Sequence, residues 1–157
     1  MYVVWANCTT SGQNSTEDSL GFAMSTDGGV TWAISRNNAS DMNGIRAASY
    51  INGIRVNGFP RIDVDRIGGP SNGWIYAAAA EKFVAPATDE GDVVVHRSTD
   101  GGLTWTKVRA NVTTTGRQYM AALRVDEFGG VNAVYYDTRN TPTNDSAEVY
   151  ISRSIDG

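Results

Sequence analysis

The chain of 157 residues has one cysteine, one histidine and four prolines, so several familiar kinds of site are excluded at the outset. A single cysteine cannot form an internal disulfide, and we interpret Cys8 as an ordinary loop thiol. Zinc-ligand spacings, a P-loop and a nucleophile elbow are also missing. No apolar run approaches the roughly 18 residues of a membrane-spanning helix, and Met1 leads directly into a strand-like run, so this segment shows no signal peptide.

Charged residues are scarce as well, at 19% of the chain, and the formal net charge is −4. Nucleic-acid phosphates and anionic lipids repel such a protein, so we expect neither nucleic acid as a partner nor membrane insertion. Glycine, by contrast, is abundant at 17 residues, together with seven tyrosines and four tryptophans. Glycine-rich turns between aromatic strands are typical of an all-β globular protein.

One eight-residue pattern occurs twice and begins a third time. Residues 25–32 read Ser-Thr-Asp-Gly-Gly-Val-Thr-Trp, residues 98–105 read Ser-Thr-Asp-Gly-Gly-Leu-Thr-Trp, and residues 154–157 read Ser-Ile-Asp-Gly. Asp-Gly between strand-like runs favours a hairpin, because glycine adopts positive φ and the aspartate oxygen accepts hydrogen bonds from nearby backbone N–H groups. We refer to these segments as turn motifs 1, 2 and 3, and we predict a hairpin at each.

The runs around the turn motifs recur in the same order. A strand-like run leads into each motif, and another run follows each of the two complete motifs. A further run lies earlier in each unit, at residues 2–5, 76–79 and 133–136. This alignment places Tyr135 and Tyr136 where Val4 and Trp5 stand in the first unit, so packing explains at least one of the tyrosines. Runs 61–65 and 122–126 add a first strand to the second and third units, so that only the second unit has all four strands; the first unit lacks its first strand and the third lacks its fourth. At most a short helix is expected, between Asn37 and Tyr50.

Repeated four-stranded units of roughly 40–50 residues are typical of propeller blades. We predict an all-β fold, a β-propeller of four-stranded antiparallel blades, of which this chain covers about two to three in an incomplete ring. The whole of 1–157 is one propeller segment, with blade a at 1–35, blade b at 59–109, blade c at 118–157, and linkers at 36–58 and 110–117. Since a closed ring needs at least about four blades, we interpret the chain as a fragment; the alternative is a small chain that closes by self-assembly.

The pattern Ser-x-Asp-x-Gly-x-Thr-Trp resembles the Asp-box, or bacterial neuraminidase repeat, of sialidase-like β-propellers and their non-enzymatic relatives. Both complete turn motifs match it at every defined position. The resemblance implies that the motif joins the third and fourth strands of a blade and that its aspartate is structural rather than catalytic. The residues concerned are Ser25, Asp27, Gly29, Thr31, Trp32, Ser98, Asp100, Gly102, Thr104, Trp105, Ser154 and Asp156.

The long polar loops all gather on the face opposite the turn motifs, and long loops on a rigid scaffold usually carry binding. The resemblance places a ligand site on the same face. Our candidates on this ligand face are Arg61, Glu81, Tyr136, Asp137 and Arg139. An exo-sialidase needs an arginine cluster, a tyrosine nucleophile activated by a glutamate, and an aspartate acid/base. Residues 59–62 carry the family's Phe/Tyr-Arg-Ile-Pro motif only in altered order, which puts Arg61 in doubt as a carboxylate ligand, and we assign no catalytic residue.

The single histidine, His96, aligns with Ala23 and Ser152 of the other units, which favours a surface or cross-strand role over that of a general base. Two acidic clusters, 63–65 and 89–92, are the candidates for structural calcium. Both lack the ligand spacing of a recognised calcium loop, so we expect solvated charge and no cofactor, and metal binding stays open.

Three functions follow from these patterns. The first is a non-catalytic extracellular or cell-surface module that binds a glycan or a protein, or has a structural role in a larger secreted protein. The second is part of an exo-sialidase or another glycoside hydrolase. The third is a repeat scaffold that assembles with neighbouring subunits, and the partners expected for it are those subunits or the remainder of the same propeller.

Overall fold

The computed structural model describes residues 1–8, 16–45, 47–51, 54–82, 91–141, 143 and 145–156. This part of the chain consists of strands and turns without a helix, which confirms the predicted all-β class. It therefore contains no helix that would cross a membrane. The strands are β1 (Tyr2–Asn7), β2 (Ser19–Met24), β3 (Ile34–Asp41), β4 (Ala47–Ile51), β5 (Ile54–Val56), β6 (Arg61–Val64), β7 (Ile75–Glu81), β8 (Asp92–Ser98), β9 (Thr106–Arg109), β10 (Gln118–Val125), β11 (Val131–Asp137) and β12 (Glu148–Ser154).

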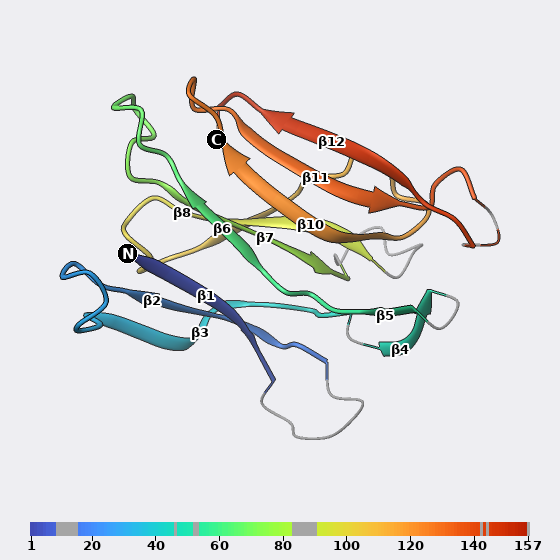
Figure 1. Ribbon diagram of the computed structural model, residues 1–157, viewed down its shortest axis with the longest axis horizontal. Coiled ribbons are helices and arrows are strands. Elements are labelled where there is room, and N and C mark those ends of the chain that lie inside the picture. The colour runs from blue at the N-terminus through green and yellow to red at the C-terminus, as the bar shows by residue number, and fades with distance from the viewer. Residues whose placement is uncertain are drawn as a thin grey trace.

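Three antiparallel sheets lie side by side and form the blades of the propeller segment (Figure 1). Blade b is the complete one, with strand order β6-β7-β8-β9, whereas blade a has the order β1-β2-β3 and blade c the order β10-β11-β12. The hairpin β4-β5 forms a small separate sheet between blades a and b in the chain. The short loops with the turn motifs lie at the left of Figure 1, and the ligand face lies at the right.

The middle strands of blade b are buried on both sides because blades a and c cover its two faces, whereas β11 of blade c alternates between buried and exposed residues. In β7 every residue is buried, and its side chains alternate between two cores. Ala78 packs in the core shared with blade c, which includes Leu123 and Tyr135. Ala77 and Ala79 pack in the core shared with blade a. Alanine on both faces lets the sheets approach closely, which explains a strand with four consecutive alanines.

Turn motifs 1 and 2 have the same hydrogen-bond pattern. In motif 1 the Ser25 hydroxyl donates to Asp27 (2.7 Å), and the Asp27 carboxylate accepts the backbone N–H of Thr31 at 2.9 Å. In motif 2 the same bonds join Ser98 to Asp100 (2.8 Å) and Thr104 N–H to Asp100 (2.9 Å). Motif 3 has the first of these bonds, from the Ser154 hydroxyl to Asp156 at 2.6 Å.

Motif 2 also joins two blades. Its Trp105 packs edge-on against Phe22 of blade a, with ring centroids 5.3 Å apart. Gly102 lies so close to the same ring that a Cβ atom built there would be 2.1 Å from a ring carbon of Phe22. Gly102 also has a φ of 93°, so glycine is required here by conformation and by the close approach of the two blades.

The described residues between Asn37 and Tyr50, which exclude residue 46, contain no helix, within the expectation of at most a short one: β3 continues to Asp41 and β4 begins at Ala47. The polar residues of β3 are extended because they pair with β2, and this pairing contains a bulge between Leu20 and Phe22.

The alignment of the third unit with the other two, as made from the sequence, is off by one residue. Ser154 of motif 3 pairs with Val131, and Ser98 of motif 2 pairs with Ile75, so Asp137 is the counterpart of Glu81. Counted back from the turn motifs in the same way, Tyr135 corresponds to Trp5 and Tyr136 to Ala6. A shift of one residue reverses which face each side chain occupies. Accordingly, Tyr135 is buried and Tyr136 is 43% exposed.

Candidate functional site

The predicted ligand-face residues lie at the ends of inner strands. Glu81 ends β7 and Asp137 ends β11, where they pair with Asp92 and Glu148 respectively. They therefore occupy equivalent positions in blades b and c. Arg61 begins β6 and is exposed, with the carbonyl of the adjacent Pro60 as a hydrogen-bond acceptor at 3.4 Å. The structure thus brings Asp137 and Arg139 together but places Arg61 and Glu81 in separate surroundings.

Around Asp137 the chain forms what we term the rim cluster, which consists of Asp137, Arg139, Asn140, Glu148 and Tyr150. The buried Asp137 carboxylate accepts the backbone N–H of Arg139 at 2.7 Å and its Nε–H at 2.8 Å. The Arg139 guanidinium lies over the ring of Tyr150, 3.9 Å from its centroid. Asn140 donates to Glu148 (2.7 Å) and to the Tyr150 hydroxyl (3.0 Å). The cluster is therefore held in one arrangement before any ligand binds.

Hydrogen bonds within the rim cluster raise the pKa of two of its members, Arg139 and Tyr150. The hydrogen bond with Asp137 raises the pKa of Arg139 above its usual range. The Tyr150 hydroxyl donates to Glu148 at 2.8 Å, and this bond raises the pKa of Tyr150. Glu148 and Asn140 are exposed, so a ligand reaches a carboxylate and an amide on the outside of the cluster. The half-exposed ring of Tyr136, stacked on Tyr119 at 5.7 Å, lies on the opposite face of β11 from Asp137 and is separate from the rim cluster.

A second polar group, the junction cluster, lies between blades a and b and consists of Ser40, Asn43, Glu81, His96 and Lys107. His96 is fully buried; its Nδ1 is 2.8 Å from Ser40 Oγ, and its Nε2 contacts Glu81 Oε1. Glu81 Oε2 accepts the backbone N–H of Asn43 at 3.2 Å and the Lys107 ammonium at 3.3 Å. Burial alone raises the pKa of Glu81, but the bonds and charges of His96 and Lys107 outweigh it and hold that pKa below its ordinary value.

Sequence reasoning anticipated the rim cluster in part and missed the junction cluster. For His96 the cross-strand role is correct, since it joins β8 to β3, but the surface role is wrong, because its side chain has no exposed area. The one available signal was a histidine at a repeat position where the other units carry Ala23 and Ser152. Lys107 lies opposite His96 in the hairpin of turn motif 2, but the partner Ser40 stands 56 positions away in the chain and gave no signal of its own.

The carboxylates of Asp63 and Asp65 were expected to be solvated by water, but both accept hydrogen bonds from the protein. Asp65 is buried, and it accepts the Ile67 N–H at 2.9 Å and the Ser71 hydroxyl at 2.5 Å. Asp63 accepts the Val125 N–H of blade c at 3.0 Å. These carboxylates organise a turn and a blade contact. Among the residues that the structure describes, no three His, Cys, Asp or Glu side chains form a group for a metal ion; residues 89 and 90 of the other acidic segment lie outside that part.

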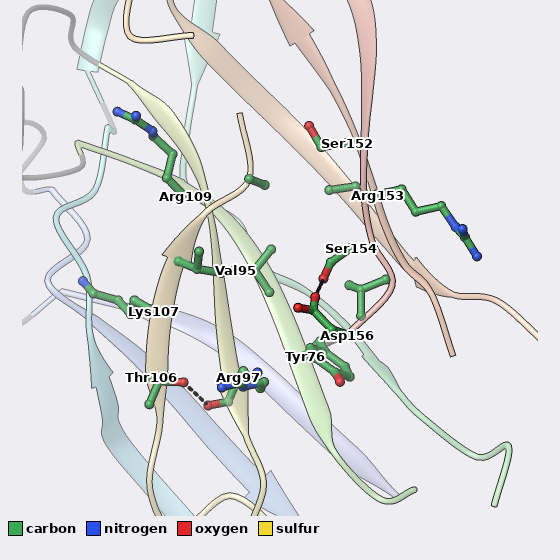
Figure 2. A pocket seen from close by; sticks show the side chains of 14 residues that line it. Tyr76, Val95, Arg97, Thr106, Lys107, Arg109, Ser152, Arg153, Ser154 and Asp156 are labelled. Atoms are coloured by element: carbon green, nitrogen blue, oxygen red, sulfur yellow. Dashed lines mark hydrogen bonds between the residues drawn. The ribbon is translucent and has the colours of Figure 1, made fainter. Parts of the chain in front are cut away.

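A cavity of about 410 Å³ lies between β9 of blade b and β12 of blade c (Figure 2). Three of its four cationic neighbours point away from it in Figure 2 and are bound elsewhere: Lys107 to Glu81, Arg109 to Asp92 and Arg153 to Asp126. The fourth, Arg97, lies over the Trp74 ring, 5.0 Å from its centroid. Val95, Val131 and Ala133 form an apolar part of the wall. The buried hydroxyl of Tyr76 faces this region and has no hydrogen-bond partner in the described part of the chain.

The internal repeat explains this cavity. Counting back three residues from the serine of each turn motif, Val95 of blade b corresponds to Phe22 of blade a. Phe22 is covered by Trp105, the tryptophan of the next turn motif. At the junction of blades b and c, Val95 lies against the cavity, and β12 is the last strand in its sheet. The cavity therefore has the position of a fourth strand and its tryptophan, and it is a poor candidate for a small-ligand site.

No family model and no curated protein matches this chain. Among solved structures, it is similar to the α-L-arabinofuranosidase Arb93A from Fusarium graminearum in complex with an iminosugar inhibitor, with a TM-score of 0.60 and 16% identity over 99% of this chain and 42% of that one. It is also similar to an α-L-arabinanase from Penicillium chrysogenum complexed with arabinobiose, with a TM-score of 0.56 and 17% identity over 98% of this chain and 42% of that one. The chain thus spans about two fifths of the length of these enzymes, and at this identity the likeness establishes the fold, that of a β-propeller segment.

Proposed function

We propose that the protein is a non-catalytic, extracellular propeller segment of the sialidase-like, Asp-box type that binds a glycan at the rim cluster. The observation that carries the proposal is the preorganised group of Arg139, Asn140, Glu148 and Tyr150 at the end of β11 and β12. Sugars offer hydroxyl groups to carboxylates and amides, and their C–H faces pack on aromatic rings. The exposed Asn140 amide and Glu148 carboxylate meet the first requirement, and the partly exposed ring of Tyr150 in the same cluster meets the second.

The state of the buried carboxylates favours binding over cleavage. Glycoside hydrolases usually need two carboxyl groups with free access to the scissile bond. Asp137 and Glu81 stand at the two equivalent strand ends, but Arg139 pairs with the first, while Lys107 pairs with the second, which His96 also contacts. Both are 1% exposed. Carboxylates bound in this way hold the blades together and are not positioned to exchange protons with a sugar.

A glycoside hydrolase is the second candidate, because the solved structures with this fold are an arabinofuranosidase and an arabinanase. Catalytic groups would then come from blades outside this segment. The two candidates differ in a simple assay, in which the protein is incubated with p-nitrophenyl α-L-arabinofuranoside, arabinobiose and a fluorogenic sialoside. Release of product at a rate that depends on protein concentration would replace the binding proposal with the enzymatic one.

The binding proposal is tested by titration calorimetry with arabino-oligosaccharides and sialylated oligosaccharides. Glu148→Gln removes the negative charge that accepts hydroxyl hydrogen bonds, so we expect about tenfold weaker binding, which corresponds to about 1.4 kcal/mol. Glu127→Gln is the matched control, because Glu127 is also exposed but lies in the loop between β10 and β11 on the opposite face. Equal affinities for the two variants would place the glycan site away from the rim cluster.

For the third function, assembly, we propose one partner: an extended segment with the sequence Gly-x-Thr-Trp that adds to the free edge of β12. Motif 3 already has its Ser154–Asp156 bond, which matches the first bond of the complete motifs. The apolar cavity beside Val95 then takes the tryptophan, as Phe22 takes Trp105. Strand addition at a free edge supplies backbone hydrogen bonds for affinity and a side-chain pocket for specificity.

A further inference from the structure

The junction cluster has the connectivity of a nucleophile, a base and an orienting carboxylate. Glu81 receives hydrogen bonds from Asn43 N–H and from the Lys107 ammonium, so it is ionised. An ionised carboxylate only accepts hydrogen bonds, so the hydrogen between it and His96 Nε2 is on that nitrogen. The lone pair of Nδ1 then faces the Ser40 hydroxyl, 2.8 Å away, and that hydroxyl donates to it. Activated serines on unrelated folds share this arrangement.

Ser40 also lies at a cavity. A hollow of about 410 Å³ is lined by six residues of β3 and of the region of β9, namely Asn38, Ala39, Ser40, Asp41, Trp105 and Lys107. Ser40 is half-buried, so it belongs both to the cavity wall and to the buried cluster. The Trp105 ring and Ala39 make part of the wall apolar, which suits a small acyl group.

Lys107 supplies the positive charge at this cavity. Its ammonium donates to the Asp41 carbonyl at 2.9 Å and to Glu81 at 3.3 Å. An ammonium has three donors, so one more N–H remains for an oxygen that gains negative charge beside Ser40.

We propose that Ser40 is a nucleophile towards small carboxylic esters, with His96 as its general base and Glu81 as the residue that positions His96. Ser40 Oγ attacks the ester carbonyl carbon while its proton passes to His96 Nδ1. The tetrahedral intermediate expels the alcohol, which takes that proton. Water then gives a proton to the same nitrogen, attacks the acyl-serine ester, and releases the carboxylic acid with Ser40 restored. This site is separate from the rim cluster and does not depend on glycan binding there.

Covalent labelling tests the proposal directly. The protein is treated with a fluorophosphonate probe, from which Ser40 Oγ displaces fluoride, and the modified residue is located by mass spectrometry. We expect the adduct on Ser40 and its complete loss in Ser40→Ala. In His96→Gln, which keeps a polar side chain but removes the base, labelling slows by at least about 100-fold. Ser35→Ala is the matched control, because Ser35 is an exposed serine on the same strand, and it labels at the unaltered rate.

The rate of p-nitrophenyl acetate hydrolysis gives a second readout. Glu81→Gln is expected to lower kcat by at least about tenfold while KM changes less than twofold, since a positioning residue acts through His96 and does not touch the ester. Melting curves establish that each variant is folded. A folded protein without a Ser40 adduct, or an adduct that forms equally fast in His96→Gln, would overturn the proposal and leave the cluster as a purely structural hydrogen-bond network.

Discussion

The second glycine of the turn motif offers a sharp test of how blades a and b are joined. Gly29 and Gly102 occupy the same place in motifs 1 and 2 and have nearly the same φ, 95° and 93°. Each also donates its N–H to the serine of its own motif at 2.8 Å. They differ in their surroundings: a Cβ at Gly102 would lie 2.1 Å from the Phe22 ring, whereas one at Gly29 would have Met1 Sδ at 3.4 Å as its nearest atom.

The two alanine substitutions therefore separate conformation from contact. Gly29→Ala carries only the cost of an L-residue at positive φ, about 1–2 kcal/mol of the free energy of unfolding. Gly102→Ala carries that cost and also forces Phe22 away from Trp105, which adds about 1–3 kcal/mol, as overpacking of a core does. The difference between the variants is thus about 1–3 kcal/mol. Urea unfolding followed by tryptophan fluorescence measures it, with the slope of the transition compared between variants.

A double mutant completes the test. If the clash with Phe22 is the cause, Phe22→Ala relieves it, and the extra cost of Gly102→Ala over Gly29→Ala disappears in the Phe22→Ala background. Equal destabilisation by the two glycine substitutions in the wild-type background would refute the reasoning, because it would mean that blade a does not press on motif 2.

Three further predictions concern motif 2, the buried tyrosines and the edge of blade c. The Thr104 hydrogen bonds lower the pKa of Asp100 from 3.8 to about 2, so the stability that this carboxylate contributes above pH 3.8 is lost as the pH falls towards 2. A series of melting curves from pH 5 to pH 2 should therefore show a smaller loss of stability for Asp100→Asn, and this variant should keep its glycan binding. Tyr76→Phe removes a buried hydroxyl that has no partner in the described residues and should stabilise the protein by about 1 kcal/mol in urea unfolding. Tyr135→Phe breaks the 2.9 Å hydrogen bond to Ser152 and should destabilise the protein. A Tyr76→Phe variant less stable than Tyr135→Phe would contradict the assignment of Tyr76. A labelled peptide with the sequence of residues 102–109 should bind the protein in fluorescence polarisation and weaken at least about fivefold when its tryptophan is replaced by alanine; equal binding of both peptides would argue against the cavity as the tryptophan site.

The blade architecture could be predicted from the sequence because its main signal is local. Asp-Gly turns and the runs around them lie within a few residues of each other, and they define hairpins without knowledge of the rest of the chain. The register of blade c was harder, since adjacent Tyr135 and Tyr136 fit an aromatic position equally well. Only the pairing of Val131 with Ser154 decides between them. The extension of β3 to Asp41 was missed because its residues are polar and lack strict alternation.

The candidate sites show the same limit at longer range. Tyr136, Asp137 and Arg139 are neighbours in the chain, and they could be singled out together. Their partners Glu148 and Tyr150 join them only through the pairing of β11 with β12. In the junction cluster, Ser40 and His96 lie 56 positions apart and on different blades. Their contact depends on how two sheets stack, and a single sequence does not contain that information in local form.

The two strand-end carboxylates, Glu81 and Asp137, lie where the connections between blades close over the sheets. At the junction of blades a and b, the segment that leaves β3 reaches β7, where Asn43 N–H donates to Glu81. At the junction of blades b and c, the segment that leaves β9 reaches β11, where the Thr138 N–H, next to Asp137, donates to the Arg117 carbonyl at 3.2 Å. In both cases the connection between blades closes over the end of the next blade's second strand. An acidic side chain there is buried with its cationic partner, so binding groups that remain accessible must come from the third strand and the loop before it, as Glu148 and Asn140 do.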